Sequence, residues 1–170
     1  NLDRLAQRSL CGLSLPVGLG ITPGSAPGHL ALFGYDPITY NIGRGILEVL
    51  GLEMEVQDGD VAARGNYCTV DQRGIVTDRR AGRVAAELNR ELTAKLEKIA
   101  LNGVEIMACS GREHRFGLLF RGQGLEEDLT DSDPQREGVS PREIRALKPE
   151  AERTAALVNE FIAKAKEILW

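Results

Sequence analysis

Apolar and polar positions follow a regular pattern from about residue 60 onward. Residues 62–70 and 74–79 are short runs rich in β-forming residues, and the Asp-Gln-Arg-Gly between them is typical of a hairpin turn. Apolar residues then recur at helical spacing from Val84 to Ile99, and the Asn-Gly pair at 102–103 is expected to end that helix. This part of the chain is therefore predicted to be a hairpin followed by a helix.

A second hairpin and a second helix are predicted in the remainder of the chain. Residues 104–109 and 114–121 form the hairpin, residues 123–149 are a polar loop, and an apolar stripe over residues 155–169 marks the helix. The order β-β-α-β-β-α favours an α+β fold of two layers. We expect a four-stranded antiparallel sheet with both helices on one of its faces.

The first 59 residues are organised differently. Residues 2–7 and 38–50 predict two short helices, with Gly12 and Gly51 as the glycines that end them. A loop rich in glycine and proline separates the two. Neither helix is long enough to bury much apolar surface alone.

Composition and charge are those of a globular domain. The chain has 170 residues, of which 42% are hydrophobic and 27% are charged, enough to form a core. Its formal net charge of −4 argues against nucleic acid or an anionic membrane as a partner. Three scattered cysteines, Cys11, Cys68 and Cys109, are expected to be buried free thiols, which favours the reducing cytoplasm.

Ser25 is a candidate nucleophile. It lies in the segment 22–37, Thr-Pro-Gly-Ser-Ala-Pro-Gly-His, followed by an apolar run, and His29 comes four residues after it. Glycines allow backbone N–H groups to approach an anion, and a serine held in such a loop suits phosphoryl transfer through a phosphoserine. The segment contains neither a P-loop nor a G-x-S-x-G elbow, so from these residues alone a plain turn is the favoured interpretation.

Arginines are the second candidate feature. The run Asp78-Arg-Arg-Ala-Gly-Arg83 places three guanidiniums at a predicted strand-to-helix junction, where they could bind phosphate and carboxylate or form a solvated basic face. Four further side chains lie at strand positions that could converge on one sheet edge: Arg64, His114, Arg115 and Arg121. Asp131-Ser-Asp133-Pro is first of all a turn signal.

Four long motifs occur in order along the chain: PGSAPGHLALFGYDPITYNIGRGILEVLG, GDVAARGNYCTVDQRGIVTDRRAGR, GREHRFGLLFRGQGL and TDSDP. Together they resemble the archaeal-type cofactor-independent phosphoglycerate mutases, which belong to the alkaline phosphatase superfamily. The resemblance covers essentially the whole chain. It departs from the family pattern after the serine, where Ala26 stands in place of the usual acidic residue and Pro27 in place of a small one.

The resemblance implies a fragment of a larger enzyme. Residues 1–59 would be a partial segment of the α/β catalytic domain that carries the nucleophile loop, and residues 60–170 the cap domain that covers the substrate. The whole protein would interconvert 2- and 3-phosphoglycerate in glycolysis, in the cytoplasm, through a phosphoserine on Ser25. Two divalent ions (manganese, magnesium or zinc) would assist, with Ser25 as one ligand and the other ligands outside this chain. The fragment alone would hold no metal and be inactive.

The resemblance also implies which residues bind phosphoglycerate, with Arg79 and Arg83 ranked above Arg80. The implied set is Arg64, Arg79, Arg83, His114, Arg115, Asp131 and Asp133. Two alternatives stay open at this point: a related metal-dependent phosphatase or phosphonate-processing enzyme of the same superfamily, and a non-catalytic binding domain that has the cap fold.

Overall fold

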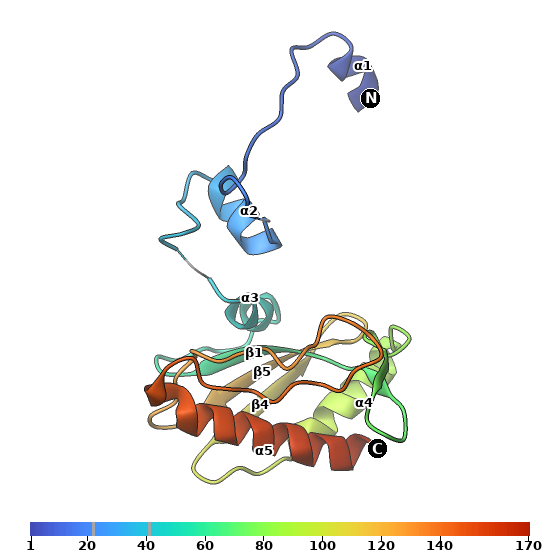
Figure 1. Cartoon of the computed structure of the whole chain (residues 1–170), viewed down its shortest axis with the longest axis vertical. Helices are drawn as coiled ribbons and strands as arrows, with labels where there is room; N and C mark the ends of the chain where they lie inside the picture. The colour runs from blue at the N-terminus through green and yellow to red at the C-terminus, as the bar shows by residue number, and fades with distance from the viewer. Residues whose placement is uncertain (22, 41) are drawn as a thin grey trace. The chain divides into compact units, whose positions relative to one another are not determined.

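The computed structural model describes residues 1–21, 23–40 and 42–170. Its contacts divide the chain into two compact units, residues 1–43 and residues 44–170 (Figure 1). Among the described residues, no helix is long and apolar enough to cross a membrane.

The first unit contains two helices, α1 (Leu2–Ala6) and α2 (Ser25–Leu32). α1 confirms the helix predicted over residues 2–7. α2 was expected to be loop, and that expectation was wrong: Pro27 falls in the first turn of α2, where its missing N–H costs nothing. Neither helix has a buried residue. Thr22, the first residue of the glycine-rich motif, lies outside the described residues.

The second unit begins with α3 (Arg44–Gly51), which is shorter than the helix predicted over residues 38–50. Residues before it form a turn instead, because the Asp36 carboxylate accepts hydrogen bonds from the Ile38 N–H and the Thr39 hydroxyl. Asn41, also within the predicted helix, lies outside the described residues. α3 packs on the sheet and buries Val49 completely, so contacts group it with residues 44–170. The boundary predicted at residue 59 concerns the whole protein and stays a prediction.

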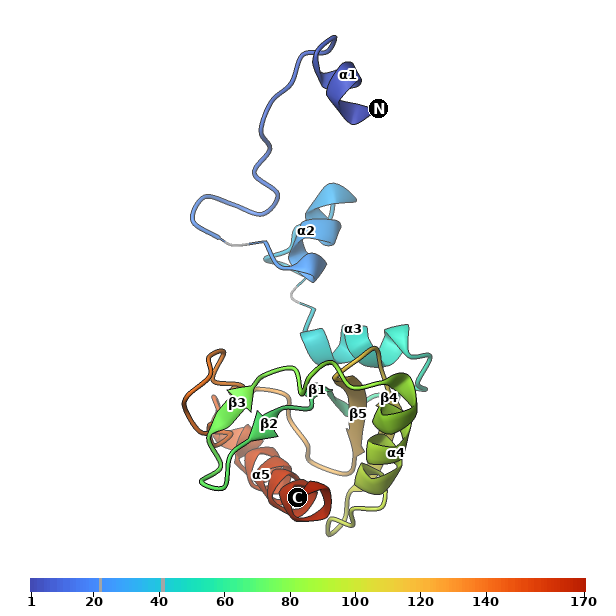
Figure 2. The ribbon, with the colours of Figure 1, turned by 90° about the vertical axis from the view of Figure 1, so that its right-hand side faces the viewer.

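The sheet is antiparallel, with the strand order β1 (Val61–Asn66), β5 (Arg115–Arg121) and β4 (Glu105–Ser110). The α+β class and the antiparallel arrangement are therefore confirmed, but the expected four strands are three. β2 (Thr69–Val70) and β3 (Val76–Asp78) form a separate two-stranded ribbon, seen beside the sheet in Figure 2.

The separate ribbon has a physical cause at Tyr67. The chain leaves the sheet after Asn66, and the buried Tyr67 ring packs 4.5 Å from Phe116, centroid to centroid. β3 then pairs on its other side with the long loop, where Val76 exchanges two backbone hydrogen bonds with Gly138 and Val139. The chain direction thus changes inside what the sequence presents as one strand over residues 62–70.

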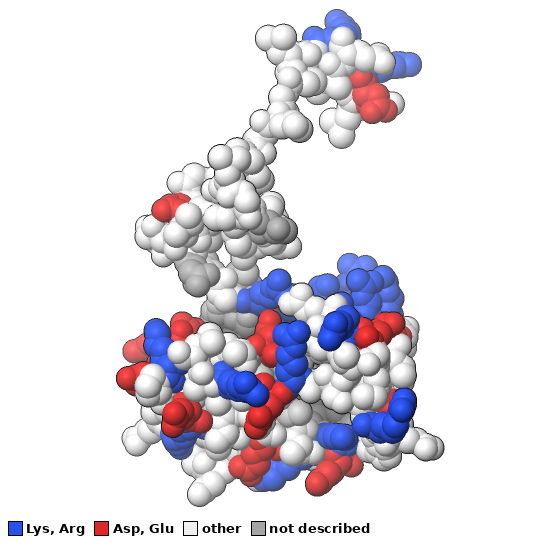
Figure 3. Space-filling model, in the orientation of Figure 1, with Lys and Arg blue, Asp and Glu red and all other residues white. Residues whose placement is uncertain are grey.

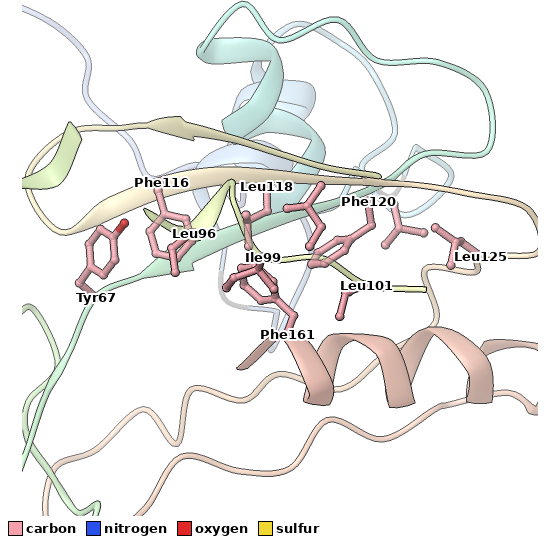
Figure 4. Packing of buried hydrophobic residues seen from close by; sticks show 11 residues of the cluster. Tyr67, Leu96, Ile99, Leu101, Phe116, Leu118, Phe120, Leu125 and Phe161 are labelled. Atoms are coloured by element: carbon pink, nitrogen blue, oxygen red, sulfur yellow. The ribbon is translucent and has the colours of Figure 1, made fainter. Parts of the chain in front are cut away.

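Helices cover both faces of the sheet. α4 (Ala86–Leu96) and α5 (Glu152–Leu169), the latter preceded by the short 3-10 helix η1 (Pro149–Ala151), lie on one face, as predicted, and α3 lies on the other (Figures 1 and 2). β5 supplies side chains to both faces. Phe116, Leu118 and Phe120 enter the core between the sheet and the helices α4 and α5, where Phe120 meets Phe161 edge-on (Figure 4).

Two glycines allow the layers to approach closely. A Cβ at Gly65 on β1 would overlap the ring of Phe116 on the α4–α5 side. A Cβ at Gly117 on β5 would lie 2.9 Å from Leu52 Cδ1 and 3.2 Å from Val49 Cγ1, on the side of α3. The sheet therefore has no room for side chains at these two positions. Because side chains alternate between the two faces of a strand, each glycine also shows which face its neighbours point to.

The three cysteines are free, as expected, but they are not buried. Cys11 and Cys68 are exposed and Cys109 is half-buried. Cys68 is exposed because it lies in the two-residue connection that leaves the sheet after Asn66.

Candidate functional site

The second unit contains an open hollow of about 450 Å³ that is lined almost entirely by polar and charged side chains. Its composition is unusual in having seven guanidiniums and only two carboxylates, Glu113 and Asp133. Figure 3 shows Lys and Arg side chains gathered along one edge of this unit. The arginines are Arg44, Arg64, Arg79, Arg80, Arg83, Arg112 and Arg115.

The sheet and α3 place the first group of these arginines. Asn66 pairs with Arg115 and Arg64 pairs with Gly117, so all four residues lie on the face of the sheet that α3 covers. α3 begins beside them with Arg44. The floor of the hollow is therefore set by strand register, which is a rigid support.

The turn after β3 supplies the second group, Arg79, Arg80 and Arg83. The Asp78 carboxylate holds this turn by accepting hydrogen bonds from the backbone N–H groups of Arg80 (2.7 Å) and Gly82 (2.6 Å). These bonds also hold the pKa of Asp78 below its usual value. Arg83 has a left-handed backbone with φ of 57°, a conformation that costs a non-glycine residue about 1 kcal/mol.

Two of the turn arginines are already paired with carboxylates. Arg79 forms a two-point ion pair with Asp133, with Nη2 to Oδ2 at 2.7 Å and Nε to Oδ1 at 3.2 Å. This pairing lowers the pKa of Asp133 and raises that of Arg79. Arg83 reaches Glu113 at 3.3 Å. Both pairs are more than a third exposed on at least one side, so each contributes little to stability.

Residues 111–115, which are the connection between β4 and β5 together with the first residue of β5, supply the third group and are held by Asn89. This side chain is completely buried on α4, and its amide lies within hydrogen-bond distance of the carbonyls of Gly111, Glu113 and Arg115. Asn89 is therefore a positioning residue for the wall of the hollow. A single asparagine in an amphipathic helix gives no signal of such a role in the sequence.

His114 is buried at the edge of the hollow, with 8% of its surface exposed. Its Nδ1 has no hydrogen-bond partner among the described residues, and the Glu113 carboxylate lies 3.9 Å from it. Burial lowers the pKa of His114, and the positive charge of Arg115 lowers it further, against a smaller opposite effect of Glu113. The imidazole is consequently neutral at neutral pH.

The lowered pKa of His114 predicts how stability depends on pH. The unfolded chain titrates near the ordinary value of 6.5 and the folded chain below it, so between these values the unfolded state binds more protons. We expect stability to be full above pH 6.5 and to fall as the pH drops toward the folded pKa. His114→Gln should make the thermal midpoint depend less on pH between about pH 5 and about pH 8. His29→Gln, at an exposed position, should not have this effect. Equal slopes in the wild-type chain and His114→Gln would contradict this origin.

The structure brings together six of the residues implied for substrate binding: Arg64, Arg79, Arg83, His114, Arg115 and Asp133. Asp131 lines a neighbouring hollow, which shares Asp133 and Gln135 with the first. Arg80, ranked below its neighbours from strand alternation, also lines the hollow because the strand ends at Asp78. These positions do not test substrate binding, which stays a prediction.

The expectation that Arg121 converges on the same edge was wrong. It lies at the other end of β5 and forms a two-point ion pair with Asp60 at 2.7 and 2.9 Å, so its role is structural.

Sequence reasoning also missed Arg44 and Arg112 as lining residues. For Arg44 a signal existed: it stands directly before the apolar stretch of α3, at the point where a helix meets the sheet.

Ser25 is the first residue of α2, in the first unit, and is exposed. Its position at a helix N-terminus leaves backbone N–H groups free to face an anion. Pro27 removes one donor that this turn would otherwise offer. The imidazole Nδ1 of His29 lies 2.5 Å from the Ser25 carbonyl oxygen, so this ring nitrogen contacts backbone and not the hydroxyl.

The described residues include no group of three or more His, Cys, Asp or Glu side chains that could hold a metal ion. The neighbours of Ser25 in α2 include no carboxylate. Ser25 alone therefore does not form a metal site.

Together, the α+β fold and the arginine-lined hollow define a domain suited to small molecules that carry phosphate or carboxylate groups. Residues 6–170 match the 2,3-bisphosphoglycerate-independent phosphoglycerate mutase family. The chain belongs to this family, which confirms the resemblance found in its motifs.

Similar proteins agree on the family. Proteins from Thermus thermophilus and Aquifex aeolicus, each described as a "probable 2,3-bisphosphoglycerate-independent phosphoglycerate mutase", are 50% identical over 99% of this chain, which spans 42% and 44% of their lengths. The cofactor-independent phosphoglycerate mutase of Thermoplasma acidophilum is similar in structure, with a TM-score of 0.71 and 40% identity over 84% of this chain and 38% of that one. The chain thus spans less than half the length of these relatives.

Proposed function

We propose that this chain is part of a phosphoglycerate mutase that interconverts 2- and 3-phosphoglycerate in glycolysis, in the cytoplasm. One observation carries the proposal: in a chain of this family, guanidiniums from four separate segments converge on one hollow. Phosphoglycerate has a phosphate and a carboxylate on a three-carbon skeleton, so it needs several fixed cations within a short distance.

In this proposal, residues 60–170 hold the glycerate skeleton and Ser25 carries the phosphoryl group. The Ser25 hydroxyl oxygen forms a bond to phosphorus while the bond from phosphorus to one glycerate oxygen breaks, and the proton lost by the serine balances the one gained by the leaving glycerate oxygen. The other glycerate hydroxyl then attacks the phosphoserine and restores the serine. The arginines retain glycerate between these steps, because its escape would leave the phosphoserine to hydrolysis and turn a mutase into a phosphatase.

Two divalent ions, manganese, magnesium or zinc, belong to the same proposal for the whole protein, with Ser25 as one ligand. When bound, such ions would favour the ionised serine and neutralise phosphate charge. The remaining ligands are proposed to lie outside this chain, since the described residues include no group of three or more His, Cys, Asp or Glu side chains that could hold a metal ion. The inactivity of this chain by itself also stays a prediction.

The test is to assay the whole protein with 2- and 3-phosphoglycerate, and separately with p-nitrophenyl phosphate and phosphonoacetate. We expect interconversion of the two phosphoglycerates to exceed phosphate release from every probe. Phosphate or phosphonate hydrolysis as the main activity would instead assign the chain to a related hydrolase. No turnover of any probe would favour a binding domain.

The turn arginines give a mutational prediction. In the whole protein, Arg79→Ala and Arg83→Ala should each lower kcat/KM by about tenfold or more, because each removes a forked donor from the hollow. The thermal midpoint should stay nearly unchanged, since exposed ion pairs contribute only about 0.2–1 kcal/mol. Arg79→Lys should restore part of the rate.

Arg73→Ala is the matched control for the turn arginines, because it removes an exposed, ion-paired guanidinium that lies outside the hollow. It should leave kcat/KM nearly unchanged. Normal turnover of Arg79→Ala and Arg83→Ala together with earlier unfolding would show that these arginines serve only as structural ion pairs.

A further inference from the structure

The turn after β3, residues 79–83, has a strained backbone. Ala81, Gly82 and Arg83 are consecutive residues in the left-handed region, with φ angles of 45°, 63° and 57°. Residues other than glycine enter this region at a cost and normally as single residues. Such a stretch persists only where other contacts of the chain hold it.

Packing accounts for one of these residues and not for another. The methyl group of Ala81 packs against the hydrophobic core, which offsets the cost of its conformation. Arg83 has an exposed side chain that reaches Glu113, and Glu113 itself is left-handed with φ of 56°. The buried Asn89 amide holds the carbonyl of Glu113. Because an exposed ion pair is too weak to hold two unfavourable backbones, the turn needs its own support.

The Asp78 carboxylate gives the turn this support. Its Oδ1 accepts a hydrogen bond from the Arg80 N–H at 2.7 Å, and its Oδ2 accepts one from the Gly82 N–H at 2.6 Å. Two oxygens thus hold two different peptide units. The ion pair of Arg79 with Asp133 fixes only the start of the turn, before the left-handed stretch. Without the Asp78 carboxylate, we expect the left-handed residues to relax.

A second turn of the same ribbon has a similar support without the strain. Between β2 and β3, the Asp71 carboxylate accepts hydrogen bonds from the N–H groups of Arg73 and Ile75, both at 2.9 Å. The left-handed position of this turn is Gly74, where such a backbone has no steric cost. This turn lies outside the hollow. The cost accepted at Arg83 therefore indicates that its side chain is needed where the turn puts it.

We propose that Asp78 is a positioning residue of the hollow: its two carboxylate oxygens hold the turn in a strained form that keeps Arg80 and Arg83 in place. Asp78 does not itself line the hollow, so it acts through the turn. The proposal rests on the proposed function for its effect on the reaction. A displaced turn would retain glycerate less well between the two phosphoryl transfers, and the phosphoserine would then react with water.

The first test is the activity of whole-protein Asp78→Ala with 3-phosphoglycerate. We expect kcat/KM to fall by about tenfold or more and the share of turnovers that end in free phosphate to rise severalfold. A merely structural role would lower both products together and leave that share unchanged. Asp78→Asn offers one oxygen where the turn uses two, so it should give an intermediate result, and it supplies the comparison if Asp78→Ala does not fold.

Asp71→Ala is the matched control, because it removes a half-buried carboxylate that holds a turn outside the hollow. It should lower the thermal midpoint about as much as Asp78→Ala but keep the wild-type kcat/KM and phosphate release. The proposal is overturned if the two alanine variants lose activity alike, or if Asp78→Ala keeps the wild-type kcat/KM and phosphate release.

Hydrogen exchange of the 170-residue chain tests the support of the turn without any ligand. The Arg83 N–H donates to the Arg80 carbonyl at 2.7 Å and not to the Asp78 carboxylate, so its exchange reports on the turn as a whole. It should exchange about tenfold faster or more in Asp78→Ala and as in the wild type in Asp71→Ala. Unchanged exchange in Asp78→Ala would overturn the proposal.

The outcome is separable from that of the proposed function. Faster exchange at Arg83 in Asp78→Ala, combined with no mutase activity in the wild-type whole protein, would leave the support by Asp78 standing and reject the mutase. Wild-type interconversion and phosphate release by Asp78→Ala in an active mutase would reject the positioning role and leave the mutase standing.

Discussion

Ser25→Ala in the whole protein is expected to reduce phosphoglycerate interconversion to background, a loss on the order of 10⁴-fold or more. A methyl group has no oxygen to accept the phosphoryl group. Because Ser25 is exposed at the first residue of α2 and no hydrogen bond joins its hydroxyl to another described residue, the substitution should change stability by less than about 0.5 kcal/mol. Steady-state assay and thermal unfolding of the same preparation measure both effects.

Ser14→Ala is the control, since it removes another exposed serine hydroxyl from the same unit and should leave turnover intact. A brief reaction with ³²P-labelled phosphoglycerate, quenched in acid, should trap label on the peptide that contains Ser25. Label on another residue, or substantial turnover by Ser25→Ala, would make Ser25 a structural serine.

Much of the second unit could be predicted from hydrophobic spacing. The predicted strands at 104–109 and 114–121 and the helix over 155–169 correspond to β4, β5 and α5, because each has one consistent apolar face. The run at 62–70 was predicted to be one strand because its composition favours β-structure throughout, but β1 ends at Asn66. Only the packing of Tyr67 against Phe116 shows where the chain leaves the sheet, and that contact joins residues distant in sequence.

The site was predictable where a motif concentrates charge and was not predictable where it depends on tertiary contacts. The three arginines in residues 78–83 are visible in the sequence, but whether they are paired depends on Asp133 in a distant loop. Arg121 shows that a correctly predicted strand does not by itself place a residue at the site. Its strand was predicted correctly, yet strand membership alone does not say which end of a strand faces the hollow, and Asp60 binds it at the opposite end.

Asn89 connects the stability of the second unit to the geometry of the hollow. Its amide is completely buried and donates to carbonyls of the 111–115 connection, the one at Glu113 lying 2.5 Å away. Its side-chain oxygen accepts a hydrogen bond from the Thr93 hydroxyl, which also meets the Tyr67 hydroxyl at 3.0 Å. One side chain therefore ties α4, the β4–β5 connection and the turn out of β1 into one buried network.

Asn89→Leu should lower the free energy of unfolding by about 3 kcal/mol, because it keeps the volume but removes the buried amide that donates to the carbonyls of residues 111, 113 and 115. The connection that carries His114 and Arg115 should also loosen. Backbone amides over residues 111–115 should then exchange with deuterium faster than global unfolding accounts for. In the whole protein, kcat/KM should also fall, because His114 and Arg115 are no longer held in place at the hollow.

Asn159→Leu is a matched control for this prediction. Asn159 on α5 clamps the backbone of Ile144 through hydrogen bonds of 3.0 and 2.8 Å, so its loss should also destabilise the unit, but away from the arginine-lined hollow. Local exchange at 111–115 should increase in Asn89→Leu and not in Asn159→Leu. If both variants lose stability and neither changes exchange at 111–115, Asn89 supports the fold without positioning the site.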